Sequence, residues 1–476
     1  MTGKLKKVGL LAPLVLLSAC VVGPKYQTPT PPTGAAAPMV SLNPAAESPA
    51  APPDDWWRLY QDPELDQLLE EAFAANTDLA AAEANLSTAR ALLESARAGR
   101  LPTTTASTEA VRGRDPVTDE ILELSGARPQ TIWVFDDVLD VSYELDLFGR
   151  VRRSVEASRA DAQAAIAARD ALKITVAAET ARAYAQVCTL GEQLAVAQHG
   201  VDVVTHEARI TEQRGQAGAS TRYDLVRAQG LVAQARAALP GLEGQRQAAL
   251  FQLTALLGRT PVNAPREVLA CVTPPRLSAL IPVGDGAGLL ARRPDVRAAE
   301  RRLAAATARI GVATADLYPR ISLTGFYGAV GTDTSDLSAE RGLAWGVGPK
   351  IAWSFPNQSL PRARIRQAQA GAAASLASFD GVVLQALKET ETALATYSAE
   401  LDHRQALAEA QDKAQQAFDL AHGQFVAGAL SQLELLTAEQ TLINADAAVA
   451  ASDGALVQDQ IGVFKALGGG WRAPKS

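Results

Sequence analysis

The most restrictive feature of the sequence is an internal repeat that covers most of the chain. Two shifts of nearly equal length align the first half with the second and keep the matched positions in order. A shift of 217 positions matches Asp78, Ala81, Ala82, Glu83, Leu86, Ala89, Ala96, Ala98 and Pro102 with Asp295, Ala298, Ala299, Glu300, Leu303, Ala306, Ala313, Ala315 and Pro319. A shift of 210 positions matches Gly218, Ala219, Leu225, Ala228, Leu257 and Gly258 with Gly428, Ala429, Leu435, Ala438, Leu467 and Gly468. Because proline, glycine and acidic positions are shared, the matches indicate a duplicated unit.

Each unit is expected to begin with a helix, over residues 78–100 and 294–317. Pro102 and Pro319 end these helices because the residue before a proline favours extended geometry. Strand-like segments follow each helix. Val141, Tyr143 and Leu145 alternate with polar residues, and Leu343, Trp345 and Val347 alternate with small ones. This period of two predicts strands with one apolar face.

Each unit is expected to end in a long helical hairpin. Residues 154–213 and 362–421 contain no proline, and about 60 residues at 1.5 Å each give a helix of roughly 90 Å. Gly215 to Gly218 and Gly423 to Gly428 mark the turns, and Pro240 is expected to kink the first return helix. The expected organisation is a signal peptide (1–19), a tether (20–55), a first repeat (56–265, with a β-hairpin over 103–148 and a helical hairpin over 154–258), a connecting segment (266–285) and a second repeat (286–471, with a β-hairpin over 321–355 and a helical hairpin over 362–468).

The strand segments suit a membrane. Each has about the 9–11 residues that a tilted spanning strand needs. Nine of the chain's aromatic residues lie in these segments, which fits the aromatic girdles of outer-membrane barrels. Two soluble hairpins with packed aromatic pairs are the alternative. If the strands span a bilayer, the four of one chain cannot close a barrel, so the chain must oligomerise. Two copies give eight strands and three give twelve, and three can leave a lumen.

The N-terminus resembles an export signal. Lys4, Lys6 and Lys7 precede a short apolar run, and Leu17-Ser-Ala-Cys20 places small residues before a cysteine. Cys20 is therefore the expected lipidation site, and the residues after it are expected to form an extended tether. Val21 is not the aspartate that often retains lipoproteins at the inner membrane, so the outer membrane is favoured. Beyond residue 20 we expect no transmembrane helix.

Composition excludes several classes of function. The net charge of −7 and the pI of about 5.4 provide no electrostatic footprint for nucleic acid. No catalytic constellation, phosphate loop or metal motif is evident, so we expect neither an enzyme nor a cofactor other than the lipid. Cys188 and Cys271 can form one disulfide, but nothing in their spacing requires it, and two unpaired, buried thiols are expected.

Several motifs together make the chain similar to a known family. They are Cys20-Val-Val-Gly-Pro-Lys-Tyr26 with Pro29, Trp56-Trp57 with Asp62-Pro63, Asp146-Leu-Phe-Gly149, Arg292-Arg-Pro-Asp-Val-Arg-Ala-Ala-Glu300 with Tyr318-Pro319, and Phe464-Lys-Ala-Leu-Gly-Gly-Gly-Trp471. In this order, over essentially the whole chain, they resemble the outer-membrane factor (TolC-like) family of tripartite efflux systems, in its lipoprotein NodT branch.

The resemblance implies a mainly α fold with membrane β-structure. The expected assembly is a homotrimer with a twelve-stranded β-barrel, four strands per chain, continued by a twelve-helix periplasmic α-barrel. The implied partners are outer-membrane lipid, a periplasmic adaptor and an inner-membrane pump, often of the RND type. The implied function is passive conduction of small molecules out of the cell.

Gating is expected near the turns of the helical hairpins. The candidates are Arg222, Asp224, Arg227, Gln432, Glu434, Thr437 and Glu439. Related sequences resemble Leu-Asp-Ala-Gln where this chain has Leu436-Thr-Ala-Glu439, so Thr437 replaces the aspartate that lines the constriction in such relatives. An acidic ring at that level is therefore in doubt, and Glu439 or Glu434 can replace it only if the helix face allows.

Two other classes of protein remain as alternatives. A periplasmic adaptor lipoprotein has one coiled-coil hairpin flanked by lipoyl-like and small β-barrel sequence, whereas this chain duplicates its hairpin and lacks such flanks. A lipid-anchored structural coiled coil has no need of amphipathic strands with aromatic residues.

Overall fold

The computed structural model describes residues 21–114, 120, 123, 124, 126, 128, 131–277 and 279–469. Their contacts separate two compact units. The first unit contains the described residues up to Pro29, together with Ser87–Ala164 and Ala299–Ser378. The second contains Thr30–Leu86, Ala165–Ala298 and the described residues from Phe379 onward. Each unit therefore takes segments from both halves of the duplicated sequence.

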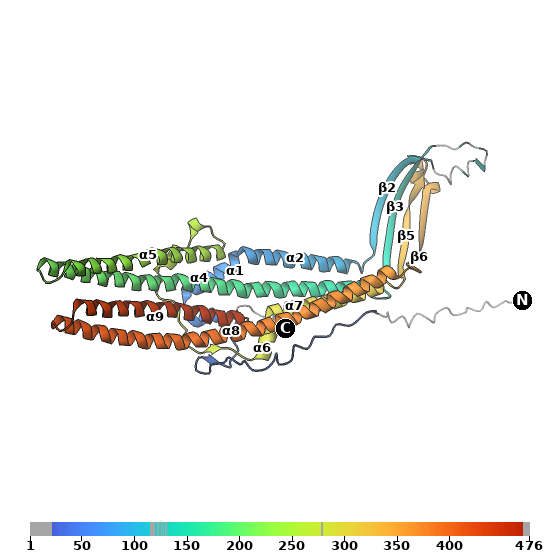
Figure 1. Cartoon of the computed structure of the whole chain (residues 1–476). Helices are drawn as coiled ribbons and strands as arrows, with labels where there is room; N and C mark the ends of the chain where they lie inside the picture. Colours follow the sequence, from blue (N-terminus) through green and yellow to red (C-terminus); the bar gives the residue numbers. More distant parts are fainter. Residues whose placement is uncertain are drawn as a thin grey trace. The chain divides into compact units, whose positions relative to one another are not determined.

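Two series of elements repeat the same order of helix, two strands, long helix and shorter helix (Figure 1). The first series is α2 (Thr77–Ala98), β2 (Thr103–Gly113), β3 (Ile132–Leu145), α4 (Arg150–Gln216) and α5 (Arg222–Leu256). The second is α7 (Pro294–Ala315), β5 (Arg320–Gly331), β6 (Leu343–Ala352), α8 (Ser359–Val426) and α9 (Gln432–Ala466). The predicted internal repeat and mainly α fold are confirmed. Pro240 lies inside α5, which is one helix from end to end.

Shorter elements precede or connect the two series. They are β1 (Glu47–Ser48), η1 (Trp56–Tyr60), α1 (Pro63–Ala75), η2 (Pro261–Asn263), η3 (Arg266–Ala270), β4 (Ile281–Pro282), α6 (Gly286–Arg292), η4 (Thr334–Ser338) and η5 (Glu340–Gly342). Asp62 starts α1 by accepting hydrogen bonds from the Glu64 and Leu65 amides, and Pro63 occupies the first turn, where no amide donor is needed.

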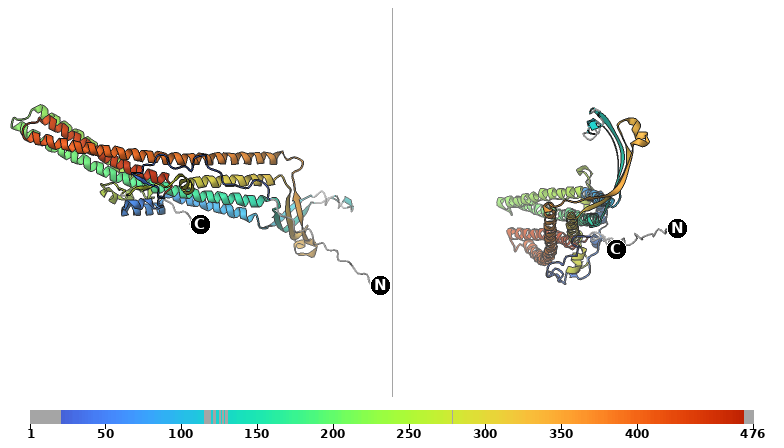
Figure 2. Two further views of the ribbon diagram at one scale, coloured as in Figure 1. Left: turned by 90° about the horizontal axis from the view of Figure 1, so that it is seen from below. Right: turned by 90° about the vertical axis from the view of Figure 1, so that its right-hand side faces the viewer.

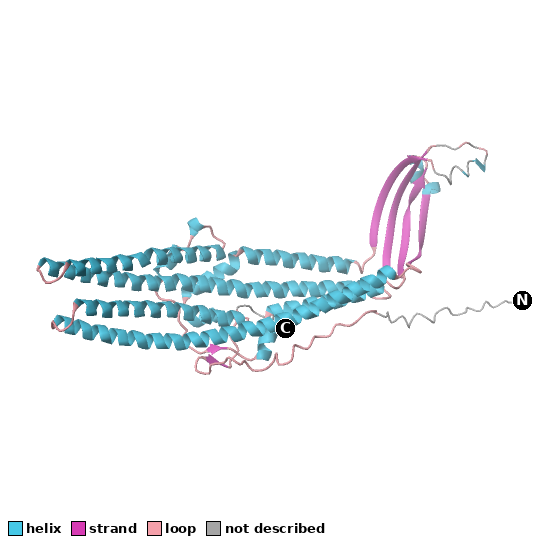
Figure 3. Ribbon diagram, in the orientation of Figure 1, coloured by secondary structure: helices cyan, strands magenta, loops and turns pink. Residues whose placement is uncertain are grey.

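The first unit holds a four-stranded antiparallel sheet in the order β2-β3-β5-β6 (Figure 3). The central pair, β3 and β5, comes from different repeats, with Phe135 opposite Gly331 and Leu145 opposite Ile321. β2 and β6 each pair on one side only among the described residues. The sheet of one chain is therefore open at both edges.

The second unit has the larger hydrophobic core. Trp56 is fully buried and stacks on Phe464, with ring centroids 4.8 Å apart. Leucines of α1 and α5, including Leu69 and Leu253, are buried in the same cluster. This core joins η1 and α1 to the ends of the return helices α5 and α9. In two views, the α4/α5 hairpin lies beside the α8/α9 hairpin (Figure 2).

Cys188 and Cys271 form a disulfide, so the prediction of two unpaired thiols is wrong. Cys188 is buried in α4, and Cys271 directly follows η3, with the two Cα atoms 4.8 Å apart. Arg246 of α5 supports the same segment by donating to the carbonyl oxygens of Leu269 and Cys271. The pairing depends on how the chain folds back on α4, which a sequence separation of 83 residues does not reveal.

The residues after position 20 are more ordered than the predicted tether. In the first unit, the Val22 amide donates to the Phe148 carbonyl, and buried Arg153 donates to the carbonyl oxygens of Val22 and Gly23. In the second unit, β1 pairs with β4. Backbone groups of this segment therefore have partners in distant parts of the chain, within each unit. Cys20 and the signal peptide lie outside the described residues.

Among the described residues, α8 alone contains a window that is apolar enough, by length and composition, to cross a membrane, with mean hydropathy 1.3. The window does not place the helix in a membrane, so the absence of a transmembrane helix stays a prediction. Length and composition alone are weak evidence for a span in a 68-residue helix.

Candidate functional site

The register of the sheet gathers apolar side chains on one face. Residues directly opposite each other in an antiparallel sheet point to the same face. Leu145 lies opposite Ile321 and Tyr143 opposite Leu323, while Ile321 lies opposite Ile351. The same register joins the two predicted apolar sets, Val141, Tyr143 and Leu145 with Leu343, Trp345 and Val347, into one face. Trp345, Val347 and Ile351 are 69%, 72% and 66% exposed in the single chain. An apolar patch of this kind marks a membrane or protein contact.

The opposite face of the sheet is mainly polar or small, with Val138, Phe326 and Val330 as apolar exceptions. It carries Asp136, Asp140, Ser142, Glu144, Ser322 and Thr324. Asp137 and Arg112 are charged exceptions on the apolar face, and both lie toward the loop ends of their strands. A sheet that is apolar on one face and polar on the other suits a barrel wall between lipid and a water-filled lumen.

Stacked aromatic pairs lie at both ends of the sheet. Trp133 stacks on Phe135 at the loop end, with centroids 5.8 Å apart. At the helix end, Phe148 stacks on Tyr318, and Trp353 stacks on Phe355. This distribution matches the aromatic girdles expected at the two interfaces of a bilayer.

The turns of the two helical hairpins are built identically. Gly218 and Gly428 have φ of +76° and +74°, a conformation that favours glycine. The next amides, of Ala219 and Ala429, donate to the carbonyl oxygens of Arg214 and Gln424, which closes a Schellman motif at the end of each long helix. The shared geometry explains why these glycines match in the two repeats.

Two of the predicted gate residues cap the return helices. Asp224 accepts from the Thr221 amide and hydroxyl, and Glu434 does the same with Ser431. The Asp224 and Glu434 amides donate back to those hydroxyls, completing a capping box in each repeat. These hydrogen bonds lower the pKa of both carboxyls below the usual value.

Four other gate candidates have different surroundings. Arg222 is exposed at the start of α5, and Arg227 lies one turn farther along, close enough to lower the pKa of Asp224 slightly. Thr437 is exposed, and its hydroxyl donates to the Leu433 carbonyl of its own helix. Glu439 differs from all of these because it is only 3% exposed.

The Glu439 side chain is buried where α9 packs against α4. Burial, with a smaller contribution from the negative charge of Glu207 on α4, raises the pKa of Glu439 to about 7. Its Oε2 atom is buried without a hydrogen-bond partner among the described residues. A buried carboxyl in this position is a destabilising element once it ionises.

Two contacts between the hairpins were not predicted from the sequence. The Gln432 amide of α9 donates to the hydroxyl of buried Thr211 on α4. The Arg214 guanidinium of α4 lies over the Phe425 ring of α8, 4.9 Å from its centroid. A match between the repeats could not reveal them, because each contact joins different positions of the two hairpins. Together they connect the turn of one hairpin to the turn of the other.

No group of three or more His, Cys, Asp and Glu side chains in the described ranges is arranged to hold a metal ion. The polar groups at the turns instead form caps and interhelical contacts.

Comparison with known families gives matches over most of the chain. The profile of the family described as "Outer membrane efflux protein" matches residues 68–259 and 288–469, one match for each series of elements. Pyoverdine export outer membrane protein OpmQ of Pseudomonas putida is 34% identical over 480 residues, which cover 97% of both chains. Nodulation protein T of Rhizobium leguminosarum bv. viciae is 28% identical over 472 residues, covering 97% of this chain and 93% of the relative.

The fold also matches a solved structure. The outer-membrane channel OprN superposes with a TM-score of 0.88 at 34% identity, covering 95% of this chain and 100% of the OprN chain.

Proposed function

The chain belongs to the outer membrane efflux protein family, and from that premise we propose that three copies form one conduit through the outer membrane. The chain is an outer-membrane channel component of an efflux system. In the proposed assembly, the four-stranded sheets form a twelve-stranded barrel, and the long helices continue the conduit through the periplasm. Small molecules delivered by a periplasmic adaptor and an inner-membrane pump, of the RND type, pass through it by diffusion.

The open amphipathic sheet is the observation that carries this proposal. β2 and β6 present unpaired edges, and a bilayer does not tolerate unsatisfied backbone donors and acceptors. Pairing β2 of one copy with β6 of the next removes both edges. Eight strands from two copies leave room only for side chains, whereas twelve can surround a lumen.

The lipid on Cys20 acts as an auxiliary anchor in this proposal. The cysteine follows a short apolar run in the sequence Leu17-Ser-Ala-Cys20. Because the sheet supplies the spanning part, losing the acyl group should impair placement more than channel formation.

The channel proposal is tested by the mass and conductance of the purified protein. Full-length protein extracted from outer membranes should have the mass of three copies, dissociate on heating and conduct ions in planar bilayers. The Cys20→Ser variant should retain these properties once it is inserted. A soluble monomer, or a stable dimer without conductance, contradicts the proposal.

We also propose that polar contacts at the hairpin turns hold the conduit closed. The candidates are Arg222, Asp224, Arg227, Gln432, Glu434, Thr437 and Glu439, to which the structure adds Thr211 as the partner of Gln432. Variants that neutralise Arg222, Asp224, Arg227 or Glu434 should raise single-channel conductance, whereas Glu439 acts in its neutral form. Unchanged conductance across the whole set rules out a gate in this region.

A further inference from the structure

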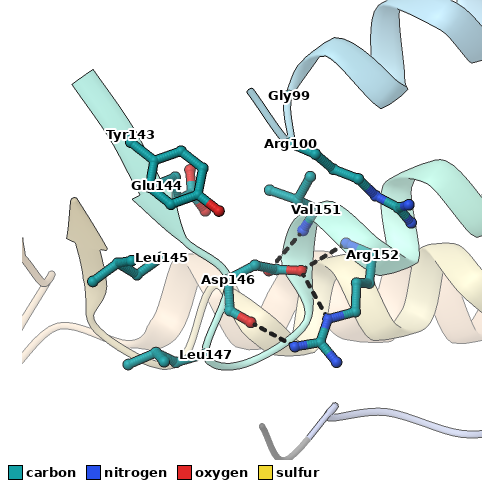
Figure 4. Close-up of a pocket in the computed structure, with 9 residues that line it drawn as sticks. All are labelled: Gly99, Arg100, Tyr143, Glu144, Leu145, Asp146, Leu147, Val151 and Arg152. Carbon is teal, nitrogen blue, oxygen red and sulfur yellow. Dashed lines mark hydrogen bonds and ion pairs between the residues drawn. The ribbon is translucent and has the colours of Figure 1, made fainter. Parts of the chain in front are cut away.

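A pocket of about 510 Å³ opens in the first unit, where β3 ends and α4 begins (Figure 4). Its walls come from three places in the chain. Gly99 and Arg100 follow α2, residues 143–147 end β3, and Val151 and Arg152 belong to the first turn of α4. None of the gate residues lines it.

One side of the pocket is apolar and continues the apolar face of the sheet. Tyr143 and Leu145 belong to that face, as their partners Leu323 and Ile321 show. Figure 4 shows Tyr143, Leu145 and Leu147 on one side of the pocket and Arg100 and Arg152 on the other. Leu145 is 39% exposed and is the last residue of β3. The pocket thus lies where the apolar face of the sheet ends.

The carboxylates near the pocket already have partners. Glu144 accepts two hydrogen bonds from Arg150. Asp146 accepts from the Val151 and Arg152 amides at 2.9 and 2.8 Å and thereby caps the start of α4. The Arg152 side chain is also paired with Asp146: it donates to the Asp146 carbonyl at 3.4 Å, and its Nε atom lies 3.6 Å from the Asp146 carboxylate. Its remaining N–H groups can donate to a further acceptor.

Arg100 has a different environment. Its side chain is exposed and makes no hydrogen bond or ion pair with the residues that the structure describes. An uncompensated guanidinium beside an apolar wall attracts an amphiphilic anion. The planar fork of arginine binds phosphate oxygens with two parallel hydrogen bonds, and Arg152 can add further donors.

We propose that this pocket binds the phosphate group of an anionic glycerophospholipid. The phosphate contacts Arg100 and Arg152, and an acyl chain extends from the pocket along Tyr143 and Leu145 over the apolar face of the sheet. Tyrosine at this level is typical of a membrane interface. The site rests on the proposed membrane-spanning function, because it lies at the end of the face that contacts lipid. The lipid would fix the depth of the sheet in the bilayer.

Native mass spectrometry of the full-length protein in mild detergent tests the site. Wild type is compared with Arg100→Gln after addition of phosphatidylglycerol, diacylglycerol or glycerol 3-phosphate. We expect wild type to retain phosphatidylglycerol in preference to diacylglycerol, and Arg100→Gln to need about tenfold more phosphatidylglycerol, as expected for one charge-assisted contact. Arg236→Gln, at an exposed position of α5, is the matched control and should bind like wild type.

Several results overturn the site. The site is overturned if wild type and Arg100→Gln retain phosphatidylglycerol equally well. It is also overturned if wild type retains diacylglycerol as well as it retains phosphatidylglycerol. Equally tight binding of glycerol 3-phosphate shows an ordinary anion site and not a lipid site. If Arg100→Gln instead dissociates the oligomer in lipid-free detergent, the pocket contacts a second copy. If Arg100→Gln fails to fold, Arg100→Lys replaces it in the test, because lysine keeps the charge but lacks the planar fork. Arg100→Lys should bind phosphatidylglycerol more weakly than wild type. Equal binding by Arg100→Lys and wild type then overturns the site.

Failure of the channel proposal would appear in a separate measurement. If wild type neither inserts into planar bilayers nor conducts, the proposed function fails whatever the lipid result. If wild type conducts while phosphatidylglycerol retention does not depend on Arg100, only the lipid site fails.

Discussion

Glu439 of α9 is buried beside α4, where its carboxyl is close enough to Glu207 for the two negative charges to repel. Burial and this repulsion raise the pKa of Glu439 from the usual 4.5 to about 7. The packed arrangement of α4 and α9 therefore favours the protonated carboxyl. Near neutral pH, a small change in proton concentration changes the charge at this contact.

The first prediction concerns pH. Between about pH 4.5 and 7, Glu439 keeps its proton when α4 and α9 are packed and loses it when they are separated or unfolded. The stability of the packed arrangement is therefore greatest below pH 4.5 and decreases as the pH rises to about 7. We expect wild-type conductance in planar bilayers to rise between about pH 5 and pH 8. Glu439→Gln, which stays neutral, should remain at the low-pH level throughout.

Glu409→Gln, at an exposed position of α8, is the control for this measurement and should follow the wild-type curve. The same pH dependence in Glu439→Gln and wild type would show that another group titrates.

The second prediction concerns the contact between hairpins. Thr211→Val keeps the shape of the side chain but removes the hydroxyl that accepts from Gln432. Loss of one such hydrogen bond costs about 1 kcal/mol, so the open population should rise about fivefold in single-channel records. Thr396→Val removes an exposed hydroxyl that donates to the Thr392 carbonyl of its own helix, and it should leave the open population unchanged. An unchanged open population in Thr211→Val contradicts a role for this contact in closure.

The third prediction concerns the segment after Cys20. Arg153→Gln removes the guanidinium that donates to the carbonyl oxygens of Val22 and Gly23. We expect residues 21–29 to become severalfold more sensitive to limited proteolysis. In the variant, opening of this segment no longer has to break two charge-assisted hydrogen bonds. Arg159→Gln, exposed on the same helix, is the control. Equal cleavage rates in the two variants would show that other contacts hold the segment.

The fourth prediction concerns the disulfide. Replacing Cys188 and Cys271 together with serine should lower the free energy of unfolding by about 2–4 kcal/mol. Thermal unfolding with and without a reductant measures this effect. Reductant should lower the melting temperature of wild type and leave that of the double variant unchanged. A melting temperature in wild type that does not respond to full reduction contradicts a stabilising role.

Local sequence patterns predicted the elements well, because each pattern acts over a few residues. Pro102 and Pro319 end helices within a few residues of the expected positions. Gly218 and Gly428 form the expected turns because only a residue without a side chain adopts their positive φ easily. The alternation in Val141, Tyr143 and Leu145 predicted the apolar face that the register of the sheet then completed. Lipidation of Cys20 stays a prediction from the sequence, since that residue is outside the described part of the chain.

The amino-acid sequence by itself therefore determined the repeat, the type of each long element and the family to which the chain belongs. Only the tertiary structure decided which residues meet. It paired β3 with β5, joined Cys188 to Cys271, assigned Asp224 and Glu434 to helix caps and buried Glu439 beside Glu207. Period and propensity are properties of neighbouring residues. Burial, pKa and pairing arise from packing between distant segments, and helices of this length can pack in many registers with the same local pattern.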